Sequence, residues 1–499
     1  MYQRQENART VCRIHISRIS QLQSDLLLYS MNTLSPPEIH GLFWLPGNEE
    51  TKVSGKCLCT EDGSIELEIL GTLSGKPIEQ DDGTVPRILG VSSNGKFVTL
   101  DDCFYRKRNF SFPGIAVAQI HVHRMYIGAH FSAAEQVAFD AISFHSTALD
   151  EWIRYSPINV ELRVGKNPGV SIDYQPPPSP KWPLKDGTIE FKFAWTAPSP
   201  GQFREAKVTQ RTLIEWNFPE PKLVSQATSY IFKLADLASL ACDRTLPIHS
   251  ITGYRKDLTE EQGEKTKRTP IEIYMNLERS QEVDHARLSR PFVLFDFKAI
   301  SETFSNAVQT WFDSYEKFDS AFNLYFATRA PRQLYLENRY LMLAQAVETL
   351  HRKMFTDVFY EKDEYAELSA AVMEGVPQKF QWWVQARLQY GNELSLRQRL
   401  KRLFSGHEEI FGGKSKVKYL ISKIVTTRNY LTHYDESLKD LAASGSEMHN
   451  LCLALELLLQ IHFCRMVGFS QDDVHQICST SEAIAGKKRE IEKNVAGDV

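Results

Sequence analysis

The hydrophobic pattern of this 499-residue chain changes its period near residue 300, and this change restricts the folds that the chain can adopt. Before that point, short apolar or alternating runs such as SIELEILGTL (64–73) and TIEFKFAWT (188–196) are separated by turn signals such as Asn94-Gly95. Because side chains alternate between the two faces of a strand, these runs predict a β-sandwich or a barrel-like sheet. After residue 300, apolar residues recur at intervals of three and four, which predicts helices with one buried face.

This change predicts a multidomain protein with a β module followed by a helical one. We expect residues 1–300 to form a β-rich module, residues 301–485 an all-α bundle, and residues 486–499 a flexible charged tail. The β module contains one helical stretch at 225–240, and its QPPPSPKWP segment (175–183) should be an exposed loop or an extended connector because proline cannot enter a sheet interior. The expected bundle helices cover residues 300–325, 332–356, 376–404, 415–437 and 446–467. The last is apolar on nearly every side, so we place it at the bundle centre.

The composition is that of a soluble globular protein, with 42% hydrophobic residues. The first 30 residues lack the apolar core of a signal peptide. The most apolar run, at 451–463, contains Glu456 and is too short to span a bilayer. We therefore expect a cytoplasmic protein with no membrane partner.

Neither the cysteines nor the histidines of the N-terminal half predict a metal site. The eight cysteines are scattered, and Cys57-x-Cys59 has no second pair of ligands, so we expect reduced thiols. His121 and His123 share one face of a predicted strand and could begin a metal site, but no third ligand is evident. The FGGKSK segment (411–416) has Glu408 where a phosphate-binding loop needs glycine, so we expect no nucleotide cofactor.

The strongest candidate for chemistry is the Arg-Asn-x-x-x-His sequence formed by Arg428, Asn429 and His433. Arginine is a permanent cation whose donors fit a phosphate, and histidine exchanges a proton near neutral pH. Together they suffice for metal-free cleavage of RNA, in which the substrate's own 2′-hydroxyl attacks the adjacent phosphate.

The surroundings of this sequence distinguish it from chance pairs with the same spacing. Arg244/His249 and Arg402/His407 repeat the spacing, but Pro247 lies inside the first pair and Gly406 ends the helix within the second. The 428/433 pair instead follows a periodic apolar stripe: Val417, Leu420, Ile421, Ile424, Val425 and Leu431.

The spacing of the pair limits what one helix can do. Asn429 and His433 are four residues apart and share a face, whereas Arg428 and His433 lie about 140° apart on an ideal helix. Only the long arginine side chain or a local unwinding would bring both groups of one chain to a single phosphate.

These residues resemble the motif of the HEPN ribonucleases, in which an Arg and a polar residue precede a His. Three further stretches resemble the ApeA-type anti-phage HEPN proteins of bacteria: GLFWLPGNEETKVSGKCLC with LEILGTLS (41–74), ENRYLMLAQAVETLHR (337–352) and LSLRQRLKRLF (394–404). The resemblance implies a C-terminal HEPN bundle that acts as a metal-independent endoribonuclease and halts a phage-infected cell. It also implies a homodimer with sites built across the interface, no cofactor, and an N-terminal module that senses a phage-derived trigger or gates the bundle.

The resemblance also implies roles for individual residues. His433 would act as general base or acid, Arg428 would stabilise the pentacovalent phosphate, and Asn429 would hold one of them or the phosphate. A polar residue on a neighbouring helix faces the pair in this family; Glu348 matches it by position in AVETLHR, and Asn338 is the alternative.

The segment that leads into the motif is basic although the net charge of the chain is only −4. Between Val376 and Arg428, eleven Lys and Arg stand against three Glu, which is a net charge of +8. This charge predicts an RNA-binding segment, with a solvated helix face as the alternative. The lysines nearest the motif are the candidate phosphate contacts: Lys414, Lys416, Lys418 and Lys423.

Two other functions remain open. Some HEPN relatives keep the bundle without the chemistry, so the chain could be a non-catalytic RNA-binding or scaffold protein. Alternatively, the β module could bind carbohydrate through its tryptophans, although aromatic residues in β domains more often belong to the core. These tryptophans are Trp44, Trp152, Trp182 and Trp195.

Overall fold

The computed structural model describes residues 37–60, 63–73, 83–109, 114–155, 157–165, 167–198, 201, 203–262, 265–276, 292–329 and 334–493. The chain forms two compact units. Of the described residues, those up to 238 and those from 246 to 276 form the β unit, and residues 239–245 together with those from 292 to 493 form the helical unit. The N-terminal 30 residues, in which we expect no signal peptide, and the last six residues of the expected tail lie outside the described part.

A six-stranded barrel forms the first half of the β unit. Its strands are β1 (Glu38–Trp44), β2 (Val53–Cys59), β3 (Ile65–Leu70), β4 (Thr84–Ser92), β5 (Phe97–Asn109) and β6 (Val117–Ile127). They are hydrogen-bonded in the order β6-β3-β2-β1-β4-β5, and β5 pairs back onto β6, so the sheet closes with every pairing antiparallel. This arrangement confirms the predicted barrel-like module, and closure removes the exposed edges that invite aggregation.

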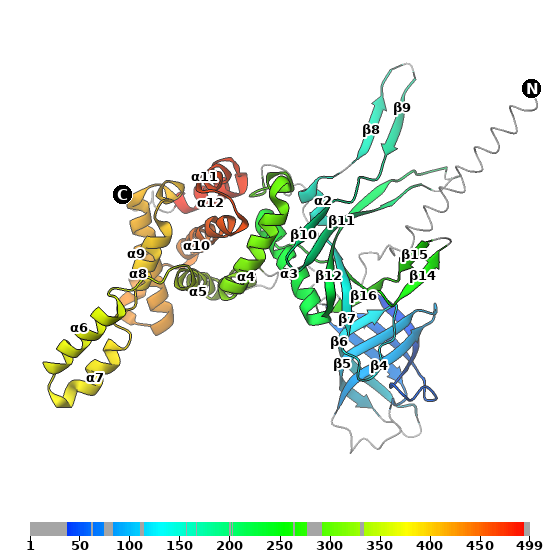
Figure 1. Cartoon of the computed structure of the whole chain (residues 1–499), viewed down its shortest axis with the longest axis horizontal. Helices are drawn as coiled ribbons and strands as arrows, with labels where there is room; N and C mark the ends of the chain where they lie inside the picture. The colour runs from blue at the N-terminus through cyan, green and yellow to red at the C-terminus, as the bar shows by residue number, and fades with distance from the viewer. Residues whose placement is uncertain are drawn as a thin grey trace, which may run out of the picture. The chain divides into compact units, whose positions relative to one another are not determined.

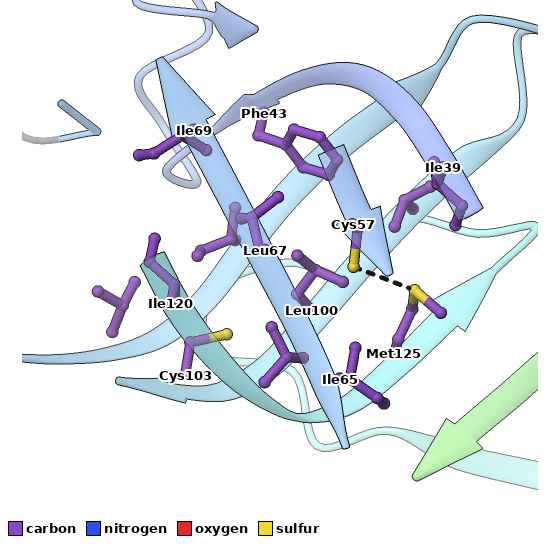
Figure 2. Close-up of a cluster of buried hydrophobic side chains, with 14 of the residues drawn as sticks. Ile39, Phe43, Cys57, Ile65, Leu67, Ile69, Leu100, Cys103, Ile120 and Met125 are labelled. Carbon is purple, nitrogen blue, oxygen red and sulfur yellow. Dashed lines mark hydrogen bonds between the residues drawn. The ribbon is translucent and has the colours of Figure 1, made fainter. Parts of the chain in front are cut away.

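The alternating sequence pattern explains the barrel core. In β3, Ile65, Leu67 and Ile69 are fully buried. They point inward together with Cys57 and Met125, whose sulfur atoms lie 3.7 Å apart (Figure 2). Burial raises the pKa of the Cys57 thiol well above its ordinary value, so this cysteine behaves as a small apolar side chain.

The sheet continues beyond the barrel from β6 in the order β16-β13-β7-β12-β11-β10. These strands are β7 (Ala138–His145), β10 (Lys181–Leu184), β11 (Gly187–Thr196), β12 (Thr209–Leu223), β13 (Ser250–Tyr254) and β16 (Ile271–Met275). The unit also contains α2 (Thr147–Ile153), most of α3 (Val224–Ala241), and the hairpins β8–β9 (Ile158–Arg163, Gly169–Tyr174) and β14–β15 (Thr259–Gln262, Lys265–Arg268). The exposed loop or extended connector expected at 175–183 ends at residue 180, because Lys181–Leu184 forms the edge strand β10. Pro183 is tolerated there because an edge strand leaves one side unpaired.

The helical unit contains nine α-helices among its described residues. They are α4 (Phe304–Ala327), α5 (Leu336–Met354), α6 (Lys362–Glu374), α7 (Gln378–Leu388), α8 (Leu396–Phe404), α9 (Lys414–His433), α10 (Gly445–Val467), α11 (Gln471–Thr480) and α12 (Glu482–Lys493). Short 3-10 segments lie at Phe297–Ala299, Ser301–Thr303, Glu408–Phe411 and Glu436–Leu441. Figure 1 shows α10 among the other helices, and it packs against α4, α5, α9, α11 and α12.

The central helix α10 is, within the described ranges, the one helix whose length and composition would allow it to cross a membrane. However, 94% of its most apolar window is buried inside the unit. It is therefore the core helix of the bundle, in the central position that its sequence predicts.

Three expectations for the helices are wrong. The single helix expected at 376–404 is two helices, because Asn392 turns the chain by bonding the backbone of Tyr360 in both directions and Ser395 starts α8 with a capping box. The helix expected to reach residue 437 ends at His433, since Tyr434 adopts a left-handed conformation with φ 50°. Residues 486–493 of the expected flexible tail continue α12.

A buried cluster of charges fixes α12 and the 239–245 segment within the helical unit. Glu456 of α10 accepts hydrogen bonds from Arg329 (2.5 Å), Arg339 (2.7 Å) and Lys487 (2.9 Å). Asp243 accepts from Arg329 (3.0 Å) and Lys487 (2.8 Å). Burial opposes ionisation of Glu456, but the three cations outweigh it and hold the pKa of this carboxyl well below its usual range.

Candidate active site

Helix α9 presents the Arg-Asn-x-x-x-His residues from a firmly packed position. Its buried face consists of Val417, Leu420, Ile421, Ile424 and Thr427. The Tyr340 hydroxyl of α5 donates to the carbonyl of Ile424 at 2.6 Å, and the N–H of Ala443 donates to the Thr427 hydroxyl at 2.9 Å. These bonds attach α9 to α5 one turn before Arg428, and to the chain leading into α10 at the residue directly before Arg428.

Arg428 lies beside Glu348 of α5, the residue that the resemblance indicates. One guanidinium nitrogen of Arg428 is 3.4 Å from a carboxylate oxygen of Glu348, and another is 3.4 Å from the side-chain oxygen of Asn429. About a third of the Arg428 side chain (34%) remains exposed. The alternative candidate, Asn338, is exposed near the start of α5.

Glu348 belongs to a chain of ion pairs that continues away from the motif. Its second oxygen accepts from Arg352 at 3.2 Å, and Arg352 also donates to Glu393 at 2.7 Å. Glu393 immediately follows Asn392 and forms an isolated β-bridge with Val358. The carboxylate beside Arg428 is thus itself held in place by a second arginine.

His433 is the last residue of α9, and its side chain is exposed. The helix stays regular through this position and then stops at Tyr434, whose N–H donates to the Tyr430 carbonyl. Local unwinding therefore does not bring His433 toward Arg428. Two residues further on, hydrogen bonds from Ser437 lower the pKa of Asp435, with a smaller contribution from the charge of His433.

The four candidate RNA-binding lysines differ in their surroundings. Lys416 donates to the carbonyl of Ile491 at 3.2 Å, and burial lowers its pKa. Lys423 pairs with Glu447 at 2.9 Å. Lys414 and Lys418 lie one turn apart on α9 and are exposed. Only this second pair is presented to solvent in the way that a phosphate contact requires.

Sequence reasoning missed a second cluster beside Glu348. His351 is fully buried on α5, and its Nδ1 atom accepts from Arg399 of α8 at 3.2 Å. Burial, and then the charge of Arg399, lower the pKa of His351. Arg399 is therefore a structural residue and not a phosphate contact. Glu348, His351 and Arg352 occur together as ETLHR, and this helical spacing was the available signal.

The remaining candidates belong to packing or to local ion pairs. His121 bonds Glu66 at 3.1 Å, and His123 is exposed. The described ranges contain no group of three His, Cys, Asp or Glu side chains placed to hold a metal ion. Trp44 and Trp152 are buried in the core, and Trp182 and Trp195 pack against Phe191 and Tyr174.

Two family models match the chain and between them cover both units. Residues 38–311, more than half of the chain, match the model described as ApeA N-terminal domain 1. Residues 341–473 match the model described as Apea-like HEPN. Neither the curated proteins nor the solved structures contain a match. Glu348 and the motif of α9 both fall within the second matched range.

Proposed function

This chain belongs to the ApeA-like HEPN proteins of anti-phage defence, and on that premise we propose that it is a metal-independent endoribonuclease whose activity halts an infected cell. The observation that carries the proposal is the placement of Arg428 between Glu348 and Asn429, on a helix that ends at an exposed histidine. We place the enzyme in the cytoplasm, where its RNA substrate is found.

Each residue has a defined task in the proposed reaction. The 2′-oxygen attacks the adjacent phosphorus while His433 accepts the 2′-hydroxyl proton or donates one to the departing 5′-oxygen. Arg428 stabilises the charge on the pentacovalent phosphate. The O2′–P bond forms and the P–O5′ bond breaks, which leaves a 2′,3′-cyclic phosphate and a 5′-hydroxyl.

Glu348 positions Arg428 in this scheme without competing strongly for it. A charge-assisted hydrogen bond normally measures about 2.7–2.9 Å, whereas the Arg428–Glu348 contact is 3.4 Å. Asn429, at the same distance, supports the guanidinium from the other side. A phosphate can therefore take over the best donor geometry of Arg428 while the carboxylate keeps the side chain oriented.

The working unit that we propose is a dimer in which two α9 helices face each other. HEPN domains often dimerise, and α9 keeps Arg428 and His433 about 140° apart because it stays helical through His433. If Arg428 of one chain and His433 of the other serve one phosphate, this offset is no obstacle. A two-fold axis then repeats the site. We assign the β unit the role of sensor or gate that responds to a phage-derived trigger.

The direct test measures cleavage of total cellular RNA in the presence of a chelator, followed by end-group analysis. Arg428→Ala and His433→Ala should each reduce the rate by about 10²-fold or more. Matched controls are Arg489→Ala and His449→Ala, which change the same residue types at exposed positions of other helices, outside the predicted RNA-binding segment. Wild-type cleavage by either motif variant, or activity that requires added Mg²⁺, would refute the assignment.

A second candidate function is RNA binding without cleavage. The contact between Arg428 and Glu348 is the observation behind it: if Glu348 keeps the arginine when RNA binds, α9 still offers its lysines to RNA but has no cation to stabilise the pentacovalent phosphate. This candidate predicts RNA retention that is unaffected by His433→Ala and no cyclic-phosphate product under any condition tested.

A further inference from the structure

The hairpin formed by α6 and α7 carries an apolar surface that has no cover within the described part of the chain. No residue of either helix is buried. The hairpin extends away from the other helices of its unit (Figure 1). Its exposed apolar side chains are Leu368 (40%), Val372 (39%), Phe380 (51%), Trp382 (72%) and Trp383 (51%). A concentration of this kind marks an interaction site.

We term this hairpin the arm (residues 358–393). Hydrogen bonds and a β-bridge hold its two helices and its base together. The Tyr365 hydroxyl of α6 donates to the carbonyl of Leu388 in α7 at 2.6 Å. Asn392 donates to the carbonyl of Tyr360 and accepts from its N–H, both at 2.8 Å. The β-bridge between Val358 and Glu393 closes the two ends. The arm is therefore presented in a fixed conformation.

Four of the apolar residues lie on one side of the arm. The less exposed residues of the two helices recur every three or four positions and form the seam along which α6 and α7 pack. These residues are Tyr365, Ser369, Met373, Gln381, Val384 and Leu388. Because the two helices run antiparallel, residues that immediately precede seam positions point to the same side of the pair. These residues, which we term the arm face, include Leu368, Val372, Phe380 and Trp383. Trp382 follows a seam position and points to the opposite side.

The two helices of the arm carry opposite charge. In α6, Asp363, Glu364, Glu367 and Glu374 stand against Lys362, a net charge of −3. In α7, Lys379 and Arg387 have no acidic counterpart, a net charge of +2. Both cations lie over arm-face rings, with Lys379 4.8 Å from the Phe380 centroid and Arg387 5.4 Å from that of Trp383.

We propose that the arm face docks on the arm face of a second copy of this chain, so that two arms form a four-helix bundle. A two-fold axis parallel to the arms places α6 of one copy on α7 of the other, which sets helices of opposite net charge against each other twice. The same axis sets the arm tips side by side, so the four apolar residues of each copy meet. This interface is separate from α9 and does not depend on RNA cleavage.

A single-stranded RNA is the competing occupant, since exposed aromatic rings beside cations stack nucleobases. The arm face favours protein over RNA for two reasons. Leu368 and Val372 offer no ring for stacking. The carboxylates of α6 would also repel a phosphate backbone.

The experiment measures self-association of the full-length chain by sedimentation equilibrium. Trp383→Glu should raise the dissociation constant of the arm-mediated association step, which is additional to the α9 dimer of the proposed function, by about 30-fold or more, as expected when a central tryptophan is lost. Trp382→Glu is the matched control, because it introduces the same charge one residue away on the opposite side, and it should change the constant by less than about threefold. Circular dichroism of both variants should equal that of the wild type, because neither tryptophan is buried.

A cross-link reports the arms themselves, so that a dimer formed elsewhere cannot mimic the result. Gly375 lies at the arm tip with an ordinary backbone conformation (φ −80°) and room for a side chain. With a homobifunctional maleimide, whose spacer does not require the backbone contact of a disulfide, Gly375→Cys should form a covalent dimer, and Trp383→Glu should abolish it. The proposal is overturned if no cross-link forms, or if Trp383→Glu weakens RNA binding but leaves the cross-link and the dissociation constant unchanged.

Discussion

Replacing Glu456 by glutamine should destabilise the helical unit severely. The Glu456 side chain is 3% exposed and faces three cations, with Asp243 as the second carboxylate of the cluster. Glutamine keeps the shape but removes one of two negative charges, so Arg339 loses its carboxylate partner in the cluster and Arg329 and Lys487 share Asp243 alone. Breaking a buried ion pair in this way costs about 3–5 kcal/mol.

Amide hydrogen exchange in peptides of α10 measures this change for the helical unit alone. A loss of about 3–5 kcal/mol corresponds to exchange about 10²-fold faster or more for the slowest amides. Glu447→Gln is the control, because it makes the same substitution on the same helix at a side chain that is 31% exposed. Its effect should stay near 1 kcal/mol or below, as for a partly exposed ion pair. Exchange in Glu456→Gln that matches Glu447→Gln would refute the reasoning.

Burial lowers the pKa of His462 from 6.5 to about 4. Between these pH values the unfolded chain binds a proton that the native chain does not, so the free energy of unfolding should fall by roughly 3 kcal/mol as the pH drops from 6.5 to 4. His462→Gln should flatten this slope in urea titrations; an unchanged slope would contradict the assignment. Lys418→Gln should reduce the log-salt slope of RNA binding by roughly 0.7, whereas Lys416→Gln, whose side chain bonds Ile491, should not; equal slopes for the two variants would contradict the distinction between them. Inactive Arg428→Ala and His433→Ala chains, allowed to exchange subunits, should regain about one competent site per heterodimer if the residues act in trans, and no recovery would argue for a site within each chain.

The spacing of apolar residues along the sequence predicts the elements whose burial follows from that spacing. The alternation in β3 and the apolar character of α10 predict which side chains are buried, and the structure confirms the barrel-like module and the central helix. The division of residues 376–404 into two helices was not predictable in the same way. It depends on Asn392, whose partner Tyr360 lies 32 residues earlier in the chain.

At the candidate site, the sequence likewise does not reveal the partners of charged residues that are distant along the chain. Resemblance pointed to Glu348, and the structure places its carboxylate beside Arg428. The basic segment, however, could not be divided into phosphate contacts and structural cations, because the partners of Lys416 and Arg399 lie 75 and 48 residues away. The sequence of α7 is also rich enough in aromatic residues to belong to a buried helix. Sequence alone does not say whether such a helix is covered by its own chain or by another.

The position of Asp243 has a consequence for how these proteins can exchange their modules. Seven residues, 239–245, belong to the helical unit although β-unit sequence flanks them on both sides. A recombination event that joined a foreign β module at residue 289 would discard Asp243 and leave Arg329 and Lys487 with Glu456 as their remaining carboxylate in the cluster. Such a hybrid would inherit every residue of the α9 motif together with an unbalanced core. Viable hybrids should therefore carry a carboxylate at the position of Asp243, so this short segment should be inherited with the helices and not with the strands that surround it.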